Sequence, residues 1–416
     1  MKFLFLYFLL FCYVFAFYIG PISVSLLISV PLFGISLIKK NYTKTIFSVF
    51  QTRLIKSVFF TWFLLLLLGV IYPIVFLTFD FSFTYILVAQ FFHLMAAIPV
   101  LGFLKYNNLS RSDVEKAFVG IFVVQTIIQI VVFSSPYLGE IILQFNHFDT
   151  EKVVGIGSHV RGKALSAATT YHLSLAYGIC FIIYIKEFLS KNVSVINVII
   201  GFLVFIGIFF AGRTGFVGCM IGLVGFFVYR EKGQYKIKLI LEVVVVLAVI
   251  LIVLSFLLMT YTPDLYENVV NDLLPYAFEF LENLDEGGSM ETRSTNQLME
   301  MWSSDWDPFE VIIGSGHFSN PDGSYYMHVD PGFLRVSLFS GIFGYFMVWL
   351  YQIKLFPLVK FKGRTKFYAS LILIYLAFMD FKGLTIGLNK FTFSISLLLS
   401  FAYLYLPNTH QLNVNE

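Results

Sequence analysis

The chain has 416 residues, of which 58% are hydrophobic, 19% aromatic and only 13% charged. Soluble domains carry about 25% charged residues, so this composition excludes an ordinary soluble protein and predicts an all-α protein that crosses a membrane many times. The net charge of +3 gives no sign of a nucleic-acid partner. The three cysteines, Cys12, Cys180 and Cys219, lie in apolar runs and predict neither a disulfide framework nor a metal site.

In chain order, about twelve apolar runs are long enough to cross a bilayer. They cover residues 3–19, 22–38, 58–78, 83–104, 116–134, 167–185, 193–211, 215–229, 239–260, 332–353, 367–383 and 386–406. No small-residue cleavage site follows the first run, so we expect an uncleaved span there rather than a signal peptide. We expect a single transmembrane domain over residues 1–416, with a medium loop at 135–166 and a large loop at 261–330 on the outer side.

The lysines and arginines predict the orientation of these spans. With both termini on the inner side, every second connection is basic and the alternate ones are not, as the positive-inside rule requires. The basic residues that then fall on the outer side are Lys152, Arg161, Lys163, Arg213, Arg293, Arg335, Lys382 and Lys390. Because the rule disfavours basic residues there, each of them is a candidate functional residue.

The large outer loop is acidic, and its single base is Arg293. Apolar residues at helical spacing predict a helix over 264–284, broken at Pro275, and a second short helix over 291–303. A glycine-rich turn, Ile313-Gly-Ser-Gly-His317, follows them. We expect this loop to form a small helical cap over the outer ends of the bundle.

The return from this loop into apolar sequence, Tyr325–Phe346, holds several chemically useful side chains within a dozen residues. Asp330 followed by Pro331 predicts the N-cap and first position of a helix that runs to about Tyr351. Arg335 then lies one turn inside the helix, near the positive end of its dipole, where the geometry suits an anion and especially a phosphate. The alternative is a plain capped helix start from which Arg335 extends to the interface.

Four outer arginines suggest one site for a polyanion or pyrophosphate, because the planar guanidinium suits bidentate contacts with phosphate. They are Arg161, with Lys163 beside it, Arg213 in the turn AGRTGF, Arg293 and Arg335. The alternative is that each one interacts with lipid headgroups or with a nearby acid such as Asp149, Asp330 or Asp380. His328 and Asp330 adjoin Arg335 and are the best-placed candidates for acid–base or positioning roles. Further possibilities are His159, His172, His317 and Glu291.

Other polar and glycine positions inside the apolar runs predict packing rather than chemistry. We expect His93 to be a hydrogen-bonded core residue, and Gln125 and Gln129 to make contacts between helices. The glycines spaced through 215–225 predict close helix packing. The sequence contains no nucleotide-binding or metal-binding motif, so we expect neither a cofactor nor a bound metal.

Four short motifs follow one another along the chain. They are Arg161-Gly162 in the medium loop, AGRTGF around Arg213, the helix from Arg293 to Trp302 closed by IIGSG, and D-x-G-F-L-R…G-I-F-G from Asp330 to Gly344. Together with the two outer loops, they make the whole chain resemble the Wzy-type O-antigen polymerases. These belong to the O-antigen polymerase/ligase family of bacterial inner membranes.

The resemblance implies a multi-spanning, lipid-phosphosugar-dependent glycosyltransferase fold of the GT-C-like class. The implied enzyme joins oligosaccharide repeat units carried on undecaprenyl pyrophosphate at the periplasmic face, during lipopolysaccharide biosynthesis, with both termini in the cytoplasm. The leaving group is a pyrophosphate, so cationic side chains would stabilise its developing charge, and a general base would deprotonate the acceptor hydroxyl. The substrate-binding residues implied are Arg161, Lys163, Arg213, Arg293, Arg335, Tyr325 and Tyr326, and the catalytic ones are His328, Asp330 and Arg335.

The partners implied are the lipid-linked donor and acceptor and the membrane lipid, with a chain-length regulator in the same membrane as a further candidate. An O-antigen ligase of the same family is one rival, although the thirteen residues from His328 to Gly341 exceed the spacing expected of a ligase. A transporter or lipid-linked sugar flippase is the rival from another class. It should place ionisable residues near mid-membrane in discontinuous helices, whereas most charges here gather at the outer face.

Overall fold

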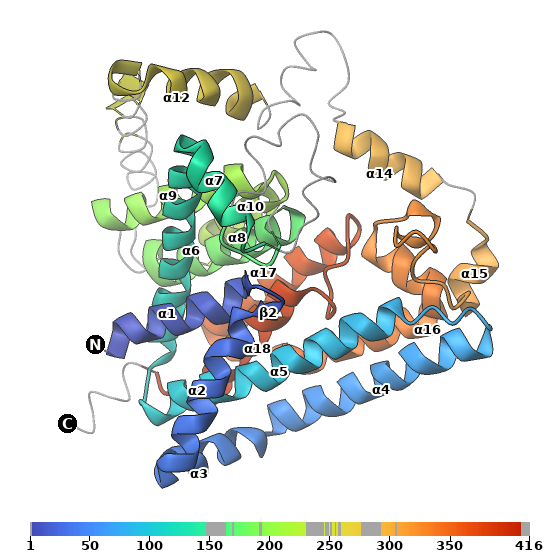
Figure 1. The fold of residues 1–416 in the computed structure, drawn as a ribbon. Coiled ribbons are helices and arrows are strands. Elements are labelled where there is room, and N and C mark those ends of the chain that lie inside the picture. Colours follow the sequence, from blue (N-terminus) through green and yellow to red (C-terminus); the bar gives the residue numbers. More distant parts are fainter. Residues whose placement is uncertain are drawn as a thin grey trace. The chain divides into compact units, whose positions relative to one another are not determined.

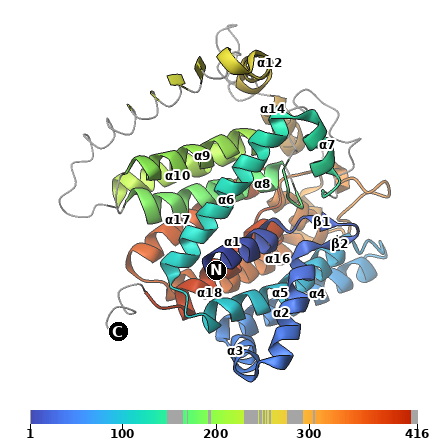
Figure 2. The same cartoon turned by 60° about the vertical axis from the view of Figure 1, so that its left-hand side comes forward.

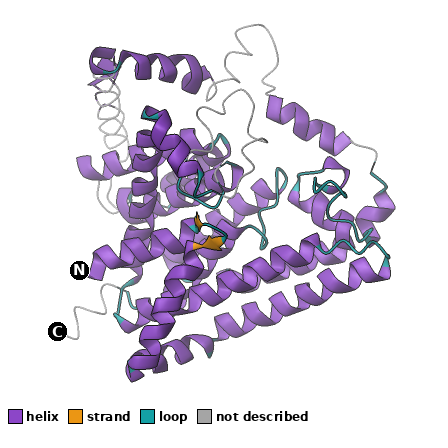
Figure 3. Ribbon diagram, viewed as in Figure 1, coloured by secondary structure: helices purple, strands orange, loops and turns teal. Residues whose placement is uncertain are grey.

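The computed structural model describes residues 2–146, 164–168, 170–190, 194–229, 245, 249, 252–253, 255–256, 259–275, 293–303 and 306–408 (Figure 1). Helices dominate this part of the chain, and its one pair of strands is a short antiparallel ribbon of β1 (Tyr18–Ile19) and β2 (Ile22–Ser23) (Figure 3). The predicted all-α class is therefore confirmed.

Five helical segments in the described ranges are long and apolar enough to cross a membrane. They are α4 (Arg53–Val75), α5 (Ser82–Tyr106), α6 (Arg111–Ser134), α8 (Tyr171–Tyr184) with the π-helical turn η2 (Ile185–Leu189), and α16 (Gly332–Leu355) with η5 (Leu358–Lys360). Shorter apolar helices are α1 (Lys2–Phe15), α2 (Val24–Ile38), α9 (Val195–Ala211), α10 (Thr214–Val228) and α18 (Lys390–Tyr405). The membrane character is confirmed, and the number of spans stays a prediction.

The remaining helices of the described residues connect these segments along the chain. They are α3 (Lys40–Phe50), α7 (Pro136–Leu143), α12 (Pro263–Asn268) with η3 (Val269–Leu273), α14 (Arg293–Ser303), α15 (Pro308–Ile313), η4 (Tyr326–His328) and α17 (Gly363–Asp380). The short helix predicted over 291–303 is confirmed from residue 293 onward. The helix predicted over 264–284 is confirmed up to residue 275, and its remainder and most of the run at 239–260 lie outside the described residues.

The chain divides into two compact units. The first comprises Met1–Ser23 and Glu115–Glu291, and the second comprises Val24–Val114 and Thr292–Glu416. In the first unit, α8, α9 and α10 run side by side (Figure 2). A Cβ atom on Gly218 of α10 would lie 2.5 Å from the Cα atom of Gly178 in α8, so the predicted close helix packing is confirmed.

Buried polar side chains join helices within each unit. In the first, the Tyr177 hydroxyl donates to Oε1 of Gln129 at 2.8 Å, as predicted for that glutamine. The same expectation is wrong for Gln125, because both atoms of its buried amide lack a hydrogen-bond partner. In the second unit, Nδ1 of His93 lies 3.4 Å from the Ser25 hydroxyl, so His93 is the hydrogen-bonded core residue that we expected.

In the second unit, α4 packs against both α5 and α16, and α2, α3 and α18 pack against α5. α18 begins at Lys390, four residues later than predicted, because a buried turn precedes it. In this turn Gly387 has a φ of +66°, which favours glycine, and its N–H donates to Oε1 of Gln352 at 3.0 Å. The Asp380 carboxylate accepts two further backbone N–H bonds from the turn, so its polar groups are satisfied away from water.

Candidate anion-binding site at the start of α16

A break in α16 positions the site. The helix is interrupted at Gly341, where φ is +69°. Just before the break, the carbonyl oxygen of Leu338 accepts hydrogen bonds from the N–H and hydroxyl of Ser315, at 2.7 and 2.9 Å. The carbonyl oxygen of Phe339 accepts from the N–H of Gly316 at 2.9 Å. The glycine-rich turn 313–317 is thus bound to the broken stretch of α16 and satisfies its carbonyl groups.

Glycine is required on both sides of this contact. A Cβ atom on Gly314 would lie 2.7 Å from the backbone nitrogen of Gly341, and one on Gly341 would lie 2.7 Å from the carbonyl oxygen of Ile313. Both glycines also have positive φ values, +92° and +69°, which other residues adopt only with strain. Close approach of two backbones therefore explains why the motifs IIGSG and G-I-F-G carry glycine here.

Asp80 fixes the next part of the chain. Its Oδ2 atom accepts backbone N–H bonds from Phe318 at 2.6 Å and Ser319 at 2.7 Å, and its Oδ1 atom accepts from Ser82 at 3.0 Å. Burial alone would raise the pKa of Asp80, but hydrogen bonds from Ser82, Ser319 and Phe318 outweigh it and lower the pKa below its ordinary value. An ionised carboxylate thus anchors the segment that carries Phe318.

Arg335 lies between two aromatic rings. Its guanidinium carbon is 4.1 Å from the ring centroid of Phe318 and 3.6 Å from that of Tyr325. The residue is only 8% exposed, and its buried Nε has no hydrogen-bond partner. Among the described residues, no carboxylate lies at ion-pair distance from Arg335. Asp330 and Asp80 supply negative charge nearby, and Tyr325 a hydrogen bond, but the buried Nε donor is left over. A desolvated cation with an unsatisfied donor is a candidate site for an anion.

The start of α16 differs from the prediction. Pro331, with a ψ of 124°, occupies the N-cap position, and no side chain caps the helix. The helix begins at Gly332, where a Cβ atom would lie 2.9 Å from the carboxyl carbon of Asp380, so only glycine fits. The prediction of Asp330 as N-cap is therefore wrong, because the extended Pro331 delays the first helical turn. Arg335 still lies in the first turn, as expected.

The carboxyl group of Asp330 therefore does not cap α16. No hydrogen bond to its side chain is formed by the described residues. Burial raises the pKa of Asp330 above its ordinary value, and the positive charges of Arg335 and Lys382 only partly offset that effect. A carboxyl group with a raised pKa beside a buried arginine is a reasonable general base or acid.

The segment between these groups has a strained backbone. Met327 and His328 have φ values of +51° and +56°, which are uncommon for residues with side chains. His328 is exposed. Tyr326 turns away from the arginine, since its ring stacks on that of His317 with 5.0 Å between centroids. Of the two tyrosines predicted to bind substrate, Tyr325 alone contacts Arg335.

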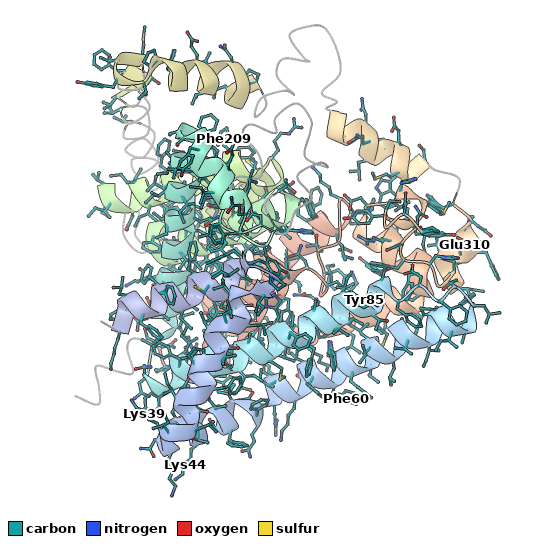
Figure 4. All side chains as sticks on the ribbon, viewed as in Figure 1. Lys39, Lys44, Phe60, Tyr85, Phe209 and Glu310 are labelled. Carbon is teal, nitrogen blue, oxygen red and sulfur yellow. The ribbon has the colours of Figure 1, made fainter. Side chains whose placement is uncertain are left out.

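Tyr326 instead contacts α15. Its hydroxyl lies 3.5 Å from a carboxylate oxygen of Glu310, which Figure 4 marks on that helix. Burial and the neighbouring Glu310 both raise the pKa of Tyr326, so this hydroxyl stays protonated. Trp302 of α14 stacks on Phe333 of α16 with 6.4 Å between ring centroids.

The other predicted basic residues belong to other parts of the chain. Arg161 and Lys163 lie outside them, as do the alternatives His159 and Glu291. Arg213 occupies the N-cap position of α10 in the first unit. Arg293 begins α14 in the second unit, and its side chain also lies outside the described part.

Sequence reasoning missed Phe318 and Asp80. Asp80 is the first acid in the chain and stands alone between two long apolar helices, a signal that was present in the sequence. In the described ranges, no group of three His, Cys, Asp or Glu side chains is placed to share a metal ion. Comparison of the chain with protein-family models, curated proteins and solved structures finds no match in any of the three.

Proposed function

We propose that this protein is an O-antigen polymerase, a membrane glycosyltransferase that joins oligosaccharide repeat units carried on undecaprenyl pyrophosphate. The proposal places it in the inner membrane of a bacterium, with the site of transfer on the periplasmic side. The observation that carries the proposal is the buried guanidinium of Arg335, held between two aromatic rings with an unsatisfied Nε and a carboxyl group of raised pKa nearby.

In the proposed reaction, the acceptor hydroxyl oxygen attacks the anomeric carbon of the donor. The bond between that carbon and the phosphate oxygen breaks, and lipid pyrophosphate leaves with the bonding electrons. Arg335 would stabilise the negative charge that develops on this leaving group, and its fixed position between Phe318 and Tyr325 means that little reorganisation is needed. Arg161, Lys163, Arg213 and Arg293 remain the further predicted contacts to pyrophosphate and sugar.

The acceptor hydroxyl must lose its proton in this step. Asp330 would take that proton as a general base, because its carboxyl group makes no structural hydrogen bond and lies near the arginine. A raised pKa makes its carboxylate a stronger base than an ordinary aspartate. The exposed His328, on the strained segment before Asp330, is assigned a positioning role toward the sugar.

The broken helix α16 is a feature that transporters also use, so it bears on the rival class. In a transporter, unwound backbone carbonyls coordinate the transported ion. Here the carbonyl oxygens of Leu338 and Phe339 already accept hydrogen bonds from Ser315 and Gly316, which leaves them less capacity to coordinate an ion. This arrangement favours an enzyme with a fixed outer site over a carrier.

The test is the length of surface polysaccharide in a strain whose own copy of the gene is deleted and replaced. We expect the deletion to leave lipid A–core with a single repeat unit, and the wild-type gene to restore the ladder while Arg335→Ala at equal membrane level does not. Bare core with accumulated lipid-linked polymer would identify a ligase instead. Failure of any lipid-linked unit to reach the outer face would identify a transporter.

A further inference from the structure

The helix α3 is an amphipathic element fixed to the second unit by one face. Tyr42, Ile46 and Val49 of this helix are buried, and the Tyr42 hydroxyl donates to the carbonyl oxygen of Pro99 in α5 at 2.9 Å. A Cβ atom on Gly102 would lie 2.9 Å from the Ile46 side chain, so glycine lets the two helices approach closely. α3 is therefore held on α5, and its other face is turned outward.

That outward face borders an open cavity of about 510 Å³ between the end of α2 and α3. Its polar lining includes Lys40, Lys44, Thr43 and Ser48, and its apolar lining includes Leu37 and Phe47. Lys105 of α5 reaches the same helix, since its Nζ donates to the Ser48 hydroxyl at 3.0 Å. Basic, hydroxyl and apolar groups thus meet in one hollow.

The positive charge here has no counter-charge nearby in the sequence. Residues 1–79 contain neither aspartate nor glutamate, and neither Lys40 nor Lys44 forms an ion pair with a described residue. Lys39 and Lys44 extend outward at the junction of α2 and α3, at the lower end of these helices in Figure 4. An anionic partner would complement this surface.

The apolar residues of the lining indicate that the anionic partner also has an apolar part. Leu37 and Ile38 are 86% and 85% exposed, and Phe47 is 62% exposed, directly beside the lysines. A free phosphate would use the lysines and leave these side chains in water. A phospholipid would contact both the basic and the apolar parts of the lining, with its phosphate on the lysines and its acyl chain along the apolar residues.

We propose that the cavity between α2 and α3 binds the headgroup phosphate of an anionic phospholipid. Lys40 and Lys44 contact the phosphate, Thr43 and Ser48 border the headgroup, and Leu37 and Phe47 line the path of the acyl chain. The site is separate from Arg335 and does not depend on the glycosyltransferase proposal. It would fix a lipid at one end of α2 and α3 and tie that end of the unit to the membrane surface.

The test is lipid binding to the purified full chain in detergent, measured by native mass spectrometry with phosphatidylglycerol, phosphatidylcholine or soluble glycerol phosphate. The double variant Lys40→Gln/Lys44→Gln is expected to bind phosphatidylglycerol roughly thirtyfold more weakly, since each lysine near a lipid surface contributes about 1 kcal/mol. The matched control Lys360→Gln/Lys362→Gln removes the same charge from exposed positions outside the cavity and should retain binding.

A second variant tests the lipid itself. Phe47→Ser keeps every charge and is expected to weaken phosphatidylglycerol binding without changing that of glycerol phosphate. Equal losses in the two lysine double variants would overturn the proposal in favour of diffuse charge attraction. Equal binding of phosphatidylcholine would overturn it, and so would glycerol phosphate that binds as tightly as the lipid. Thermal unfolding without lipid checks that each variant is folded.

Discussion

At the scale of single residues, Arg335 combines burial, flanking rings and an unsatisfied donor. Its neighbours explain each property, because Phe318 is positioned by Asp80 and Tyr325 precedes the strained segment before α16. Arg335, Asp330 and Tyr325 could be predicted as site residues from the sequence, because they lie where the large polar loop returns to an apolar run. It could not single out Phe318, because a phenylalanine in an aromatic-rich chain gives no local sign that a cation lies over its ring.

The first prediction concerns the planar shape of the guanidinium. Arg335→Lys keeps the positive charge but loses the planar group that stacks on both rings, so we expect polymer formation to fall almost as far as in Arg335→Ala. Loss of one preorganised charge-stabilising group costs about 10²–10³ in rate. The measurement is the initial rate of repeat-unit transfer in membranes. Arg364→Lys, on α17, is the control and should keep near wild-type activity.

The second prediction concerns the pH dependence of transfer. Asp330 acts as a base only when ionised, and its pKa is raised by burial despite the neighbouring Arg335 and Lys382. Activity should therefore fall on the acid side at a pH above the ordinary aspartate value of about 3.9. Asp330→Asn should be nearly inactive at every pH. An acid limb that is unchanged in the residual activity of Asp330→Asn would rule out this base.

At the scale of elements, the apolar runs predicted the long helices, because a backbone in lipid must satisfy its own hydrogen bonds, but they did not predict α3, α7 or α15. The same logic does not predict the break at Gly341 or the buried turn before α18. Those features depend on bonds from Ser315, Gly316 and Gln352. Asp80 and the loop it anchors are 238 residues apart, a pairing that helical periodicity cannot reveal.

The third prediction tests the anchor made by Asp80. Asp80→Asn weakens charge-assisted hydrogen bonds to the N–H groups of Phe318 and Ser319, and we expect it to lower stability by about 1–3 kcal/mol, less where water screens the charge. Asp322→Asn changes an exposed carboxylate of the same loop and should alter thermal unfolding much less.

The sign of the pH effect at Asp80 follows from its lowered pKa. The stabilisation is fully present above the unfolded aspartate pKa and is lost as the pH falls through the lower folded value. Asp80→Asn should therefore lose more stability at neutral pH than in acid. An equal loss at both pH values would mean that the carboxylate charge is not what anchors the loop.

The fourth prediction tests the contact between the glycine-rich turn and α16. Gly314→Ala adds a methyl group 2.7 Å from the nitrogen of Gly341 at a φ of +92°, and we expect a loss of at least about 2 kcal/mol in unfolding free energy. Gly323→Ala is the matched control, because Gly323 has a φ of +79° but open space around it. Similar losses in the two variants would show that backbone strain alone matters.

At the scale of the whole molecule, charge placement and hydropathy predict a many-spanning protein, and five long apolar segments in the described residues agree with that class. The structure also divides into two units, a division that apolar periodicity did not indicate. Arg213 belongs to the first unit and Arg335 to the second, so the predicted convergence of arginines depends on how the units associate. No local pattern of residues determines such an association.

The measurement that tests the central claim most directly is repeat-unit transfer by the purified protein. The protein would be reconstituted in vesicles with a defined repeat unit on undecaprenyl pyrophosphate, and the products would be separated by length. We predict a ladder of lipid-linked oligomers and release of undecaprenyl pyrophosphate with wild type, and neither with Arg335→Ala. Substrate that stays at one repeat unit with folded wild-type protein, or an equal ladder from Arg335→Ala, would contradict the account.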